Sequence, residues 1–362
     1  MVGTIYTPIL RWRQAEIQAL RDLNDKNNIL PMMIFQYPTK ILSSTDEKVF
    51  LQACDSMAET IPQEICSSWG DGREFFADFD VIEPQKNKEK FANDFIKNAT
   101  KLNLTPIPVV DPYDSIDFIK QIIALSQKHL DGKICLRLRG KDLTNPAQVV
   151  KNFCSQYKIP KLKLSIIADL LDDTSEKSYA DTLQALMKIE TITLYDNLII
   201  AASAFPIDMS KITDEKNTID REEWNNWQKY CSAEKYLRYP TFADYTIRHP
   251  IYNPSAEFHL PSATIKYTLS KEWLFLRGKK GKNEHYLSNA STFIKTPLFY
   301  GKDFSAGDEY IAKKGEFFET YRKNPTLKGT GNAREWIYAG INHHITVVAD
   351  QLANLRDTAT SS

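Results

Sequence analysis

Ile29-Leu-Pro-Met-Met-Ile-Phe35 and Asn197-Leu-Ile-Ile-Ala-Ala-Ser203 are apolar at consecutive positions rather than at alternate ones. A strand reads this way when both of its faces are covered, which is typical of a parallel sheet that lies under helices. Further runs of strand length accompany these two stretches. We therefore predict strands over Ile5–Leu10, Ile29–Phe35, Glu74–Ile82, Leu104–Val110, Lys133–Arg139, Leu162–Asp169, Asn197–Ser203 and Thr241–Thr246.

Segments with helical spacing lie between most of these strands. Phe91, Phe95 and Ala99 recur at intervals of four, and Ile116–Leu130 and Tyr179–Ile189 carry similar apolar stripes. One strand and one crossover helix repeat about every thirty residues. Such a succession favours a (β/α)₈ TIM-barrel-like fold, with an open doubly wound sheet as the alternative. The open sheet is less favoured because neither Gly-x-Gly-x-x-Gly nor a phosphate loop is present.

The pattern changes after about residue 250. Ser262–Leu269 and Glu272–Arg277 predict two successive strands, which form either a hairpin or a closing strand with an excursion. Helices are predicted over Tyr286–Phe293, Asp308–Tyr321 and Asn332–Leu355, the last with one apolar stripe. We therefore expect a barrel domain over residues 1–280 and a C-terminal helical extension over residues 281–362, packed on the barrel.

Composition limits the class of protein. The 362 residues include 46 Lys and Arg against 46 Asp and Glu, and this neutrality gives no strong nucleic-acid signal. No signal peptide and no apolar run long enough to span a membrane are found. The five cysteines contain no C-x-x-C pair, so no zinc site is expected. The sequence thus predicts a cytoplasmic protein with reduced thiols, no metal and no cofactor.

Charged residues gather where the predicted strands end. In a barrel these positions form the mouth, where ligands bind. Paired carboxylates there suit a metal or acid–base chemistry, or else cap helices and pair with arginines. Two arginines on one face of a strand suit phosphate or carboxylate, or else a closed structural Asp–Arg network. The candidate ligand-binding residues are Asp78, Asp80, Asp111, Arg137, Arg139, Asp169, Arg277 and Lys279, with the catalytic residues left unknown.

Other conspicuous side chains are expected to have packing roles. His344 lies on the apolar stripe of the last helix, beside His343, and adjacent histidines on a helix point too far apart to chelate one ion well. Trp224 and Trp227 are three residues apart, so they share a helix face. We expect this pair to pack on the barrel, with a contact patch as the alternative.

The two ends of the chain resemble the beta family, whose members occur in satellite phages, prophages and bacterial defence loci. The resemblance rests on Tyr6-Thr-Pro-Ile-Leu-Arg-Trp-Arg-Gln-Ala-Glu-Ile-Gln-Ala-Leu20, on Ile29–Ile34 and on Trp336-Ile-Tyr-Ala-Gly-Ile-Asn-His-His-Ile-Thr346. An acidic residue is expected after the second strand in this family, and Gln36 stands there instead. The resemblance implies a phage-encoded or anti-phage context, often beside a toxic gene, and brings no known reaction.

Two functional hypotheses follow. The first is an interaction protein of a phage-encoded or anti-phage module, which restrains or cooperates with a neighbouring toxic gene product. Its partner is then a protein encoded nearby. Whether the chain also forms a homo-oligomer is left open. The second is a barrel enzyme or sensor that acts on a phosphate-bearing ligand at the barrel mouth. Whether the chain is an enzyme is left open, because fold alone does not decide function.

Overall fold

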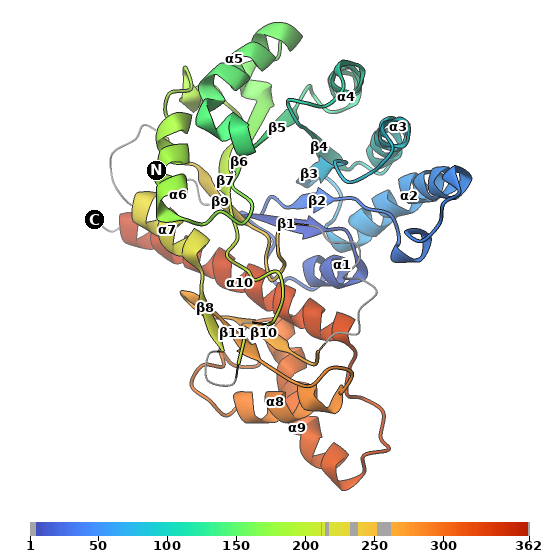
Figure 1. Ribbon diagram of the computed structural model, residues 1–362, viewed down its shortest axis with the longest axis vertical. Coiled ribbons are helices and arrows are strands. Elements are labelled where there is room, and N and C mark those ends of the chain that lie inside the picture. The colour runs from blue at the N-terminus through green and yellow to red at the C-terminus, as the bar shows by residue number, and fades with distance from the viewer. Residues whose placement is uncertain (1–4, 211, 214–216, 232–237, 252–261, 361–362) are drawn as a thin grey trace. The chain divides into compact units, whose positions relative to one another are not determined.

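The computed structural model describes residues 5–210, 212–213, 217–231, 238–251 and 262–360. Eight parallel strands close into a barrel in the order β1-β2-β3-β4-β5-β6-β7-β9 (Figure 1). Seven of them lie within predicted strand ranges and the first extends one residue beyond its range, to Arg11, so the (β/α)₈ prediction is confirmed. The strands are β1 (Thr7–Arg11), β2 (Met32–Ile34), β3 (Glu74–Asp78), β4 (Thr105–Val110), β5 (Ile134–Arg139), β6 (Leu164–Asp169), β7 (Leu198–Ala201) and β9 (Thr241–Asp244).

Helices surround these strands, as Figure 1 shows for α2 to α6. Their apolar stripes face inward; Phe91 and Phe95 on α3 are fully buried against the Phe35 ring. Side chains that accept a backbone N–H, such as Ser115 and Ser175, begin several of the helices. The helices are α2 (Glu47–Ser68), α3 (Gln85–Lys101), α4 (Ile116–His129), α5 (Pro146–Tyr157), α6 (Glu176–Leu186) and α7 (Glu222–Cys231).

The barrel closes between its first and last strands. β9 pairs in parallel with both β1 and β7, and the Tyr6 hydroxyl donates to Asp244 Oδ1 at 2.6 Å. Trp224 and Trp227 on α7 are each 1% exposed, with ring centroids 5.0 and 5.7 Å from that of Phe242 on β9. The tryptophan pair therefore packs on the barrel, as expected.

The chain divides into two compact units that alternate along the sequence, and none of the boundaries between them lies at residue 280. The first unit holds residues 1–12, 28–203 and 222–244, and the second holds residues 13–27, 204–221 and 245–362. Of the two alternatives for the predicted strands after residue 250, the structure has the hairpin, formed by β10 (Ile265–Thr268) and β11 (Glu272–Leu276). It belongs to a three-stranded antiparallel sheet with β8 (Thr218–Asp220) rather than to the barrel. Segment 245–280 therefore joins the C-terminal helices, because its strands pair with one another.

The second unit also contains α1 (Gln14–Arg21), α8 (Glu284–Phe293), α9 (Ala306–Lys323) and α10 (Ala333–Thr360). α9 and α10 approach so closely at Gly307 that a Cβ there would lie 2.2 Å from the Ala339 carbonyl oxygen. The middle of α10, residues 338–345, is buried on every side rather than along one stripe. No helix of the described residues is long and apolar enough to cross a membrane.

Polar side chains of α10 tie this unit together. Asn342 accepts from the Gly307 N–H at 2.8 Å and donates to the Ala19 carbonyl at 3.0 Å. His343 Nδ1 lies 2.8 Å from Asp308 Oδ2, and its Nε2 lies 2.8 Å from the Thr268 carbonyl oxygen. His344 Nδ1 lies 2.8 Å from Thr268 Oγ1. Both histidines are 0% exposed, so the packing role expected for His344 is confirmed and extends to His343.

Candidate functional site

Arg137 lies in the inner layer of the barrel mouth and is ion-paired to two aspartates. Its Nη1 lies 2.5 Å from Asp78 Oδ2 at the end of β3. Its Nη2 and Nε lie 2.6 and 2.9 Å from Asp169 Oδ2 at the end of β6. The three residues are 4%, 2% and 0% exposed. Charges buried this deeply are stable only when paired, and this arginine uses its donors on the protein itself.

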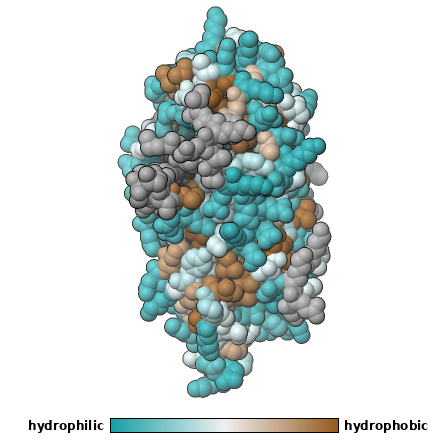
Figure 2. All heavy atoms as spheres, turned by 90° about the vertical axis from the view of Figure 1, so that its left-hand side faces the viewer, coloured by the Kyte–Doolittle hydropathy of each residue, from teal (hydrophilic) through white to brown (hydrophobic). Residues whose placement is uncertain are grey.

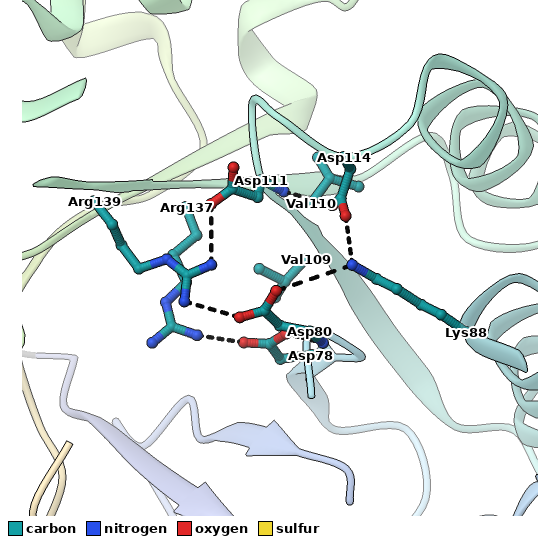
Figure 3. A pocket seen from close by; sticks show the side chains of 9 residues that line it. All are labelled: Asp78, Asp80, Lys88, Val109, Val110, Asp111, Asp114, Arg137 and Arg139. Carbon is teal, nitrogen blue, oxygen red and sulfur yellow. Dashed lines mark hydrogen bonds and ion pairs between the residues drawn. The ribbon is translucent and has the colours of Figure 1, made fainter. Parts of the chain in front are cut away.

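Arg139 repeats the arrangement two residues further along β5, nearer to solvent. Its Nη1 lies 2.8 Å from Asp80 Oδ2, and its Nη2 lies 3.0 Å from Asp111 Oδ2 (Figure 3). Burial raises the pKa of Asp80, but the charge and hydrogen bond of Arg139 outweigh burial and leave that pKa below its ordinary value. Because alternate residues of a strand share a face, Arg137 and Arg139 point to the same side and form two stacked layers of ion pairs.

The backbone holds the aspartates in place. Asp78 Oδ1 accepts from the Asp80 N–H at 2.9 Å, and Asp169 Oδ1 accepts from the Leu171 N–H at 3.0 Å. Asp111 Oδ1 accepts from the Tyr113 N–H at 2.9 Å. Each aspartate thus begins a turn after its strand with one oxygen and binds an arginine with the other.

Lys88 and Asp114 complete the cluster and were not predicted from the sequence. Lys88, on the first turn of α3, pairs closely with Asp114 and lies 4.0 Å from Asp80 Oδ1. Burial raises the pKa of Asp114 despite the charge of Lys88. One sequence feature could have identified Lys88 as a residue of this cluster. It precedes Phe91 by three residues, which places a charged side chain on the buried stripe of the helix.

The hollow inside this cluster is small and carries more negative than positive charge. It measures about 10 Å³, room for about one water molecule. Four carboxylates (Asp78, Asp80, Asp111 and Asp114) and three cations (Lys88, Arg137 and Arg139) line it, and Asp169 pairs with Arg137. An incoming phosphate would meet arginines that are already paired and an excess of acids. In this geometry the mouth is a closed ion-pair network.

Arg277 and Lys279 are not brought to this cluster. Both follow β11, which pairs with β10 and β8 in the second unit and is not a barrel strand. The Arg277 guanidinium donates to the Ile212 carbonyl, and both residues are exposed. The sequence Arg-Gly-Lys occurs at 139–141, after β5, and at 277–279, after β11, so its two copies follow strands of different sheets. The other six predicted residues lie together.

A family model described as "Beta protein" matches residues 6–350. The chain belongs to the beta protein family. The catalytic domain of a family GH18 chitinase from the fern Peteris ryukyuensis is 15% identical, with a TM-score of 0.33 over 56% of this chain and 73% of that one. A GH128 (subgroup VI) exo-beta-1,3-glucanase from Aureobasidium namibiae is 14% identical, with a TM-score of 0.33 over 58% and 87%. Comparison with curated proteins gave no match.

The sequence ends that resemble the family have architectural roles in this beta protein. The first includes β1, which closes the barrel against β9. The last supplies Asn342, His343 and His344, whose side chains are all buried and bonded within the second unit. Among the described residues, no group of three or more His, Cys, Asp or Glu is placed to hold a metal ion.

Proposed function

We propose that this beta protein is a cytoplasmic interaction protein of a phage-encoded or anti-phage module, whose partner is a protein encoded nearby. One observation carries the proposal: the mouth arginines are used by aspartates of the barrel, and the hollow among them holds about one water. The phage context, and a role in restraining or cooperating with a toxic neighbour, rest on the family resemblance. In this proposal the barrel carries a surface for a partner protein and does not enclose a substrate-binding site.

The rim of the mouth supplies a surface suited to a protein partner. Tyr113 lies between β4 and α4 and is 62% exposed, and Ile116, the first residue of α4, is 54% exposed. The Tyr113 hydroxyl donates to Asp142 Oδ1 at 2.7 Å, and Lys141 Nζ lies 4.3 Å from the centre of its ring. A held aromatic ring with a polar tip loses little freedom on binding and is a frequent interface hot spot. Figure 2 shows the side of the molecule that is on the left in Figure 1. That face is mostly hydrophilic, with hydrophobic residues in patches.

The alternative, an enzyme or sensor for a phosphate-bearing ligand, has less support. It needs free cationic groups at the mouth, whereas Arg137 and Arg139 each pair with two carboxylates. A phosphate would have to displace these acids and leave buried carboxylates without a cation. We expect inorganic phosphate to leave the melting temperature of the protein unchanged.

Co-purification tests the interaction. The tagged chain is expressed from its native locus, and the neighbouring gene products that remain bound are identified. Tyr113→Ala combined with Ile116→Asp should remove most of the captured neighbour. Leu162→Asp is the matched control, because Leu162 is 67% exposed and lies before β6 rather than at the mouth. Capture of no neighbour, or tight and salt-sensitive binding to random duplex DNA, would overturn the proposal.

A further inference from the structure

The C-terminal part of the second unit is basic, although the chain as a whole is neutral. Residues 262–334 contain 14 Lys and Arg against 7 Asp and Glu, whereas the whole chain has 46 of each kind. The loop between β11 and α8 holds Lys279, Lys280 and Lys282 at three of four consecutive positions, and all three are exposed. Opposite charges elsewhere in the chain therefore hide a local positive field.

Two stacked aromatic rings bring a second basic segment to this loop. The Tyr286 ring, on the first turn of α8, stacks on the Trp336 ring, on the first turn of α10, with 4.8 Å between the centroids and 6° between the planes. Lys282 precedes the first ring by four residues, and Arg334 precedes the second by two. Lys328 lies in the loop that leads into α10. The starts of the two helices and their cations therefore lie together.

Hydrogen bonds and close packing fix the backbone under these cations. The Ala263 N–H donates to the Lys279 carbonyl at 3.3 Å. A Cβ at Gly278 would lie 2.4 Å from the Ala263 carbonyl oxygen, so the loop after β11 lies directly against the segment before β10. In the other loop, the Thr330 carbonyl accepts from Trp336 Nε1 at 3.1 Å. A surface whose backbone is already ordered loses less freedom when a partner binds.

Few acids are placed to neutralise these cations. Lys282 Nζ lies 4.0 Å from Glu284 Oε1. Glu335 Oε2 already accepts from the Asn332 N–H at 2.8 Å. Among the described residues, no ion pair joins the other exposed cations here to an acid. We refer to the following five residues as the basic surface: Lys279, Lys280, Lys282, Lys328 and Arg334.

We propose that the basic surface binds an acidic segment of a partner protein. Each lysine is a compact charge that can pair with a single carboxylate. The Tyr286 and Trp336 rings stack on each other and are each 3% exposed, so they offer nucleic-acid bases no face for stacking. A DNA duplex carries charge far beyond a surface of this size and would be repelled by the excess of acids in the rest of the chain. A short acidic segment avoids that repulsion.

This site goes beyond the proposed function. It lies wholly in the second unit, on residues that the proposed contact at the barrel rim does not use. Its test needs only the purified chain and a peptide. A failed co-purification therefore leaves the basic surface untouched, and a failure to bind the peptide leaves the rim contact untouched.

Fluorescence anisotropy tests the proposal on the full-length chain. The probe is a fluorescein-labelled oligoglutamate peptide at low ionic strength. We expect saturable binding that disappears at about 1 M salt, where the Debye length is about 3 Å. Lys279→Glu combined with Lys280→Glu should weaken binding at least about tenfold, because two attractive contacts become repulsive. If this variant does not fold, Lys328→Glu combined with Arg334→Glu tests the basic surface from its other loop.

Lys120→Glu combined with Lys128→Glu is the matched control. Both lysines are exposed on α4 in the first unit, and their reversal changes the net charge of the chain by the same amount. The affinity for the peptide should stay within about twofold of the wild-type value, because distant charges are screened. No binding of the peptide, or an equal loss in the two double variants, would overturn the proposal. Tighter binding of single-stranded oligothymidylate, of a random DNA duplex or of phosphatidylserine vesicles would also overturn it, by assigning the surface to a nucleic acid or a membrane.

Discussion

Replacing Arg137 with leucine removes the cation on which two buried carboxylates depend. Asp78 and Asp169 lie 2.5 and 2.6 Å from the guanidinium and are almost fully buried. Removing one partner of a buried ion pair costs about 3–5 kcal/mol, because the other charge is left uncompensated. Two carboxylates are stranded here, so we expect the upper end of that range. Since whole proteins are stable by about 5–15 kcal/mol, urea unfolding will report this loss clearly.

Arg139→Leu is the matched control on the same strand. Arg139 also pairs with two aspartates, but its side chain is 26% exposed and Asp80 is 34% exposed. Water can replace the lost cation there, so the free energy of unfolding should fall by about 1 kcal/mol or less. A loss at Arg137 no larger than the loss at Arg139 would refute the argument from burial.

A further variant shows whether uncompensated charge is the cause. Adding Asp78→Asn and Asp169→Asn to Arg137→Leu should restore much of the stability, because the amide oxygens can still accept from the Asp80 and Leu171 N–H groups. If these two substitutions do not rescue the protein, the loss arises from packing instead.

Other predictions concern the second unit. Asp308→Asn should lower the free energy of unfolding by about 1–3 kcal/mol, because this buried carboxylate contacts Tyr267, Ser305 and His343 and an amide nitrogen in place of one oxygen would leave a buried donor unpaired; an unchanged free energy of unfolding would contradict this role. Gly307→Ala should cost at least about 1–3 kcal/mol, because its Cβ would meet the Ala339 carbonyl oxygen, and an unchanged melting temperature would disprove that contact. Ending the chain at Gly331 should give insoluble or molten protein, because about 1.5–3 kcal/mol is lost for each large aliphatic side chain of α10; cooperative unfolding of a soluble product would show otherwise.

The barrel could be predicted from the sequence because covered parallel strands read as continuous apolar runs. The same reading placed Asp78, Asp111 and Asp169 at strand ends. The pairing of Asp78 and Asp169 with Arg137, and of Asp111 with Arg139, then followed from the topology. Lys88 was missed because its partner Asp114 lies in the next strand-to-helix loop, and a helix stripe does not reveal what it faces.

Arg277 was misplaced for a related reason. A strand that ends in Arg-Gly-Lys looks the same in a barrel as in a side sheet, and only its pairing partner distinguishes the two. The strand in question, β11, pairs with β10 and with β8, and β8 has only three residues and no distinctive pattern in the sequence. The burial of the Asn342-His343-His344 sequence on all sides was likewise hidden, because each of its hydrogen bonds depends on residues distant in the chain.

The joining of β9 to β1 and β7 sets the order of events while the chain is being made. Tyr6 and Asp244, which bond across that seam, are 238 positions apart. A ribosome that adds about 5–20 residues per second needs about 12–48 s to supply the missing strand. During that interval the nascent barrel has two unpaired strand edges, and such edges invite pairing with other chains. The yield of this protein in a cell therefore depends on how well those edges are shielded before synthesis reaches β9.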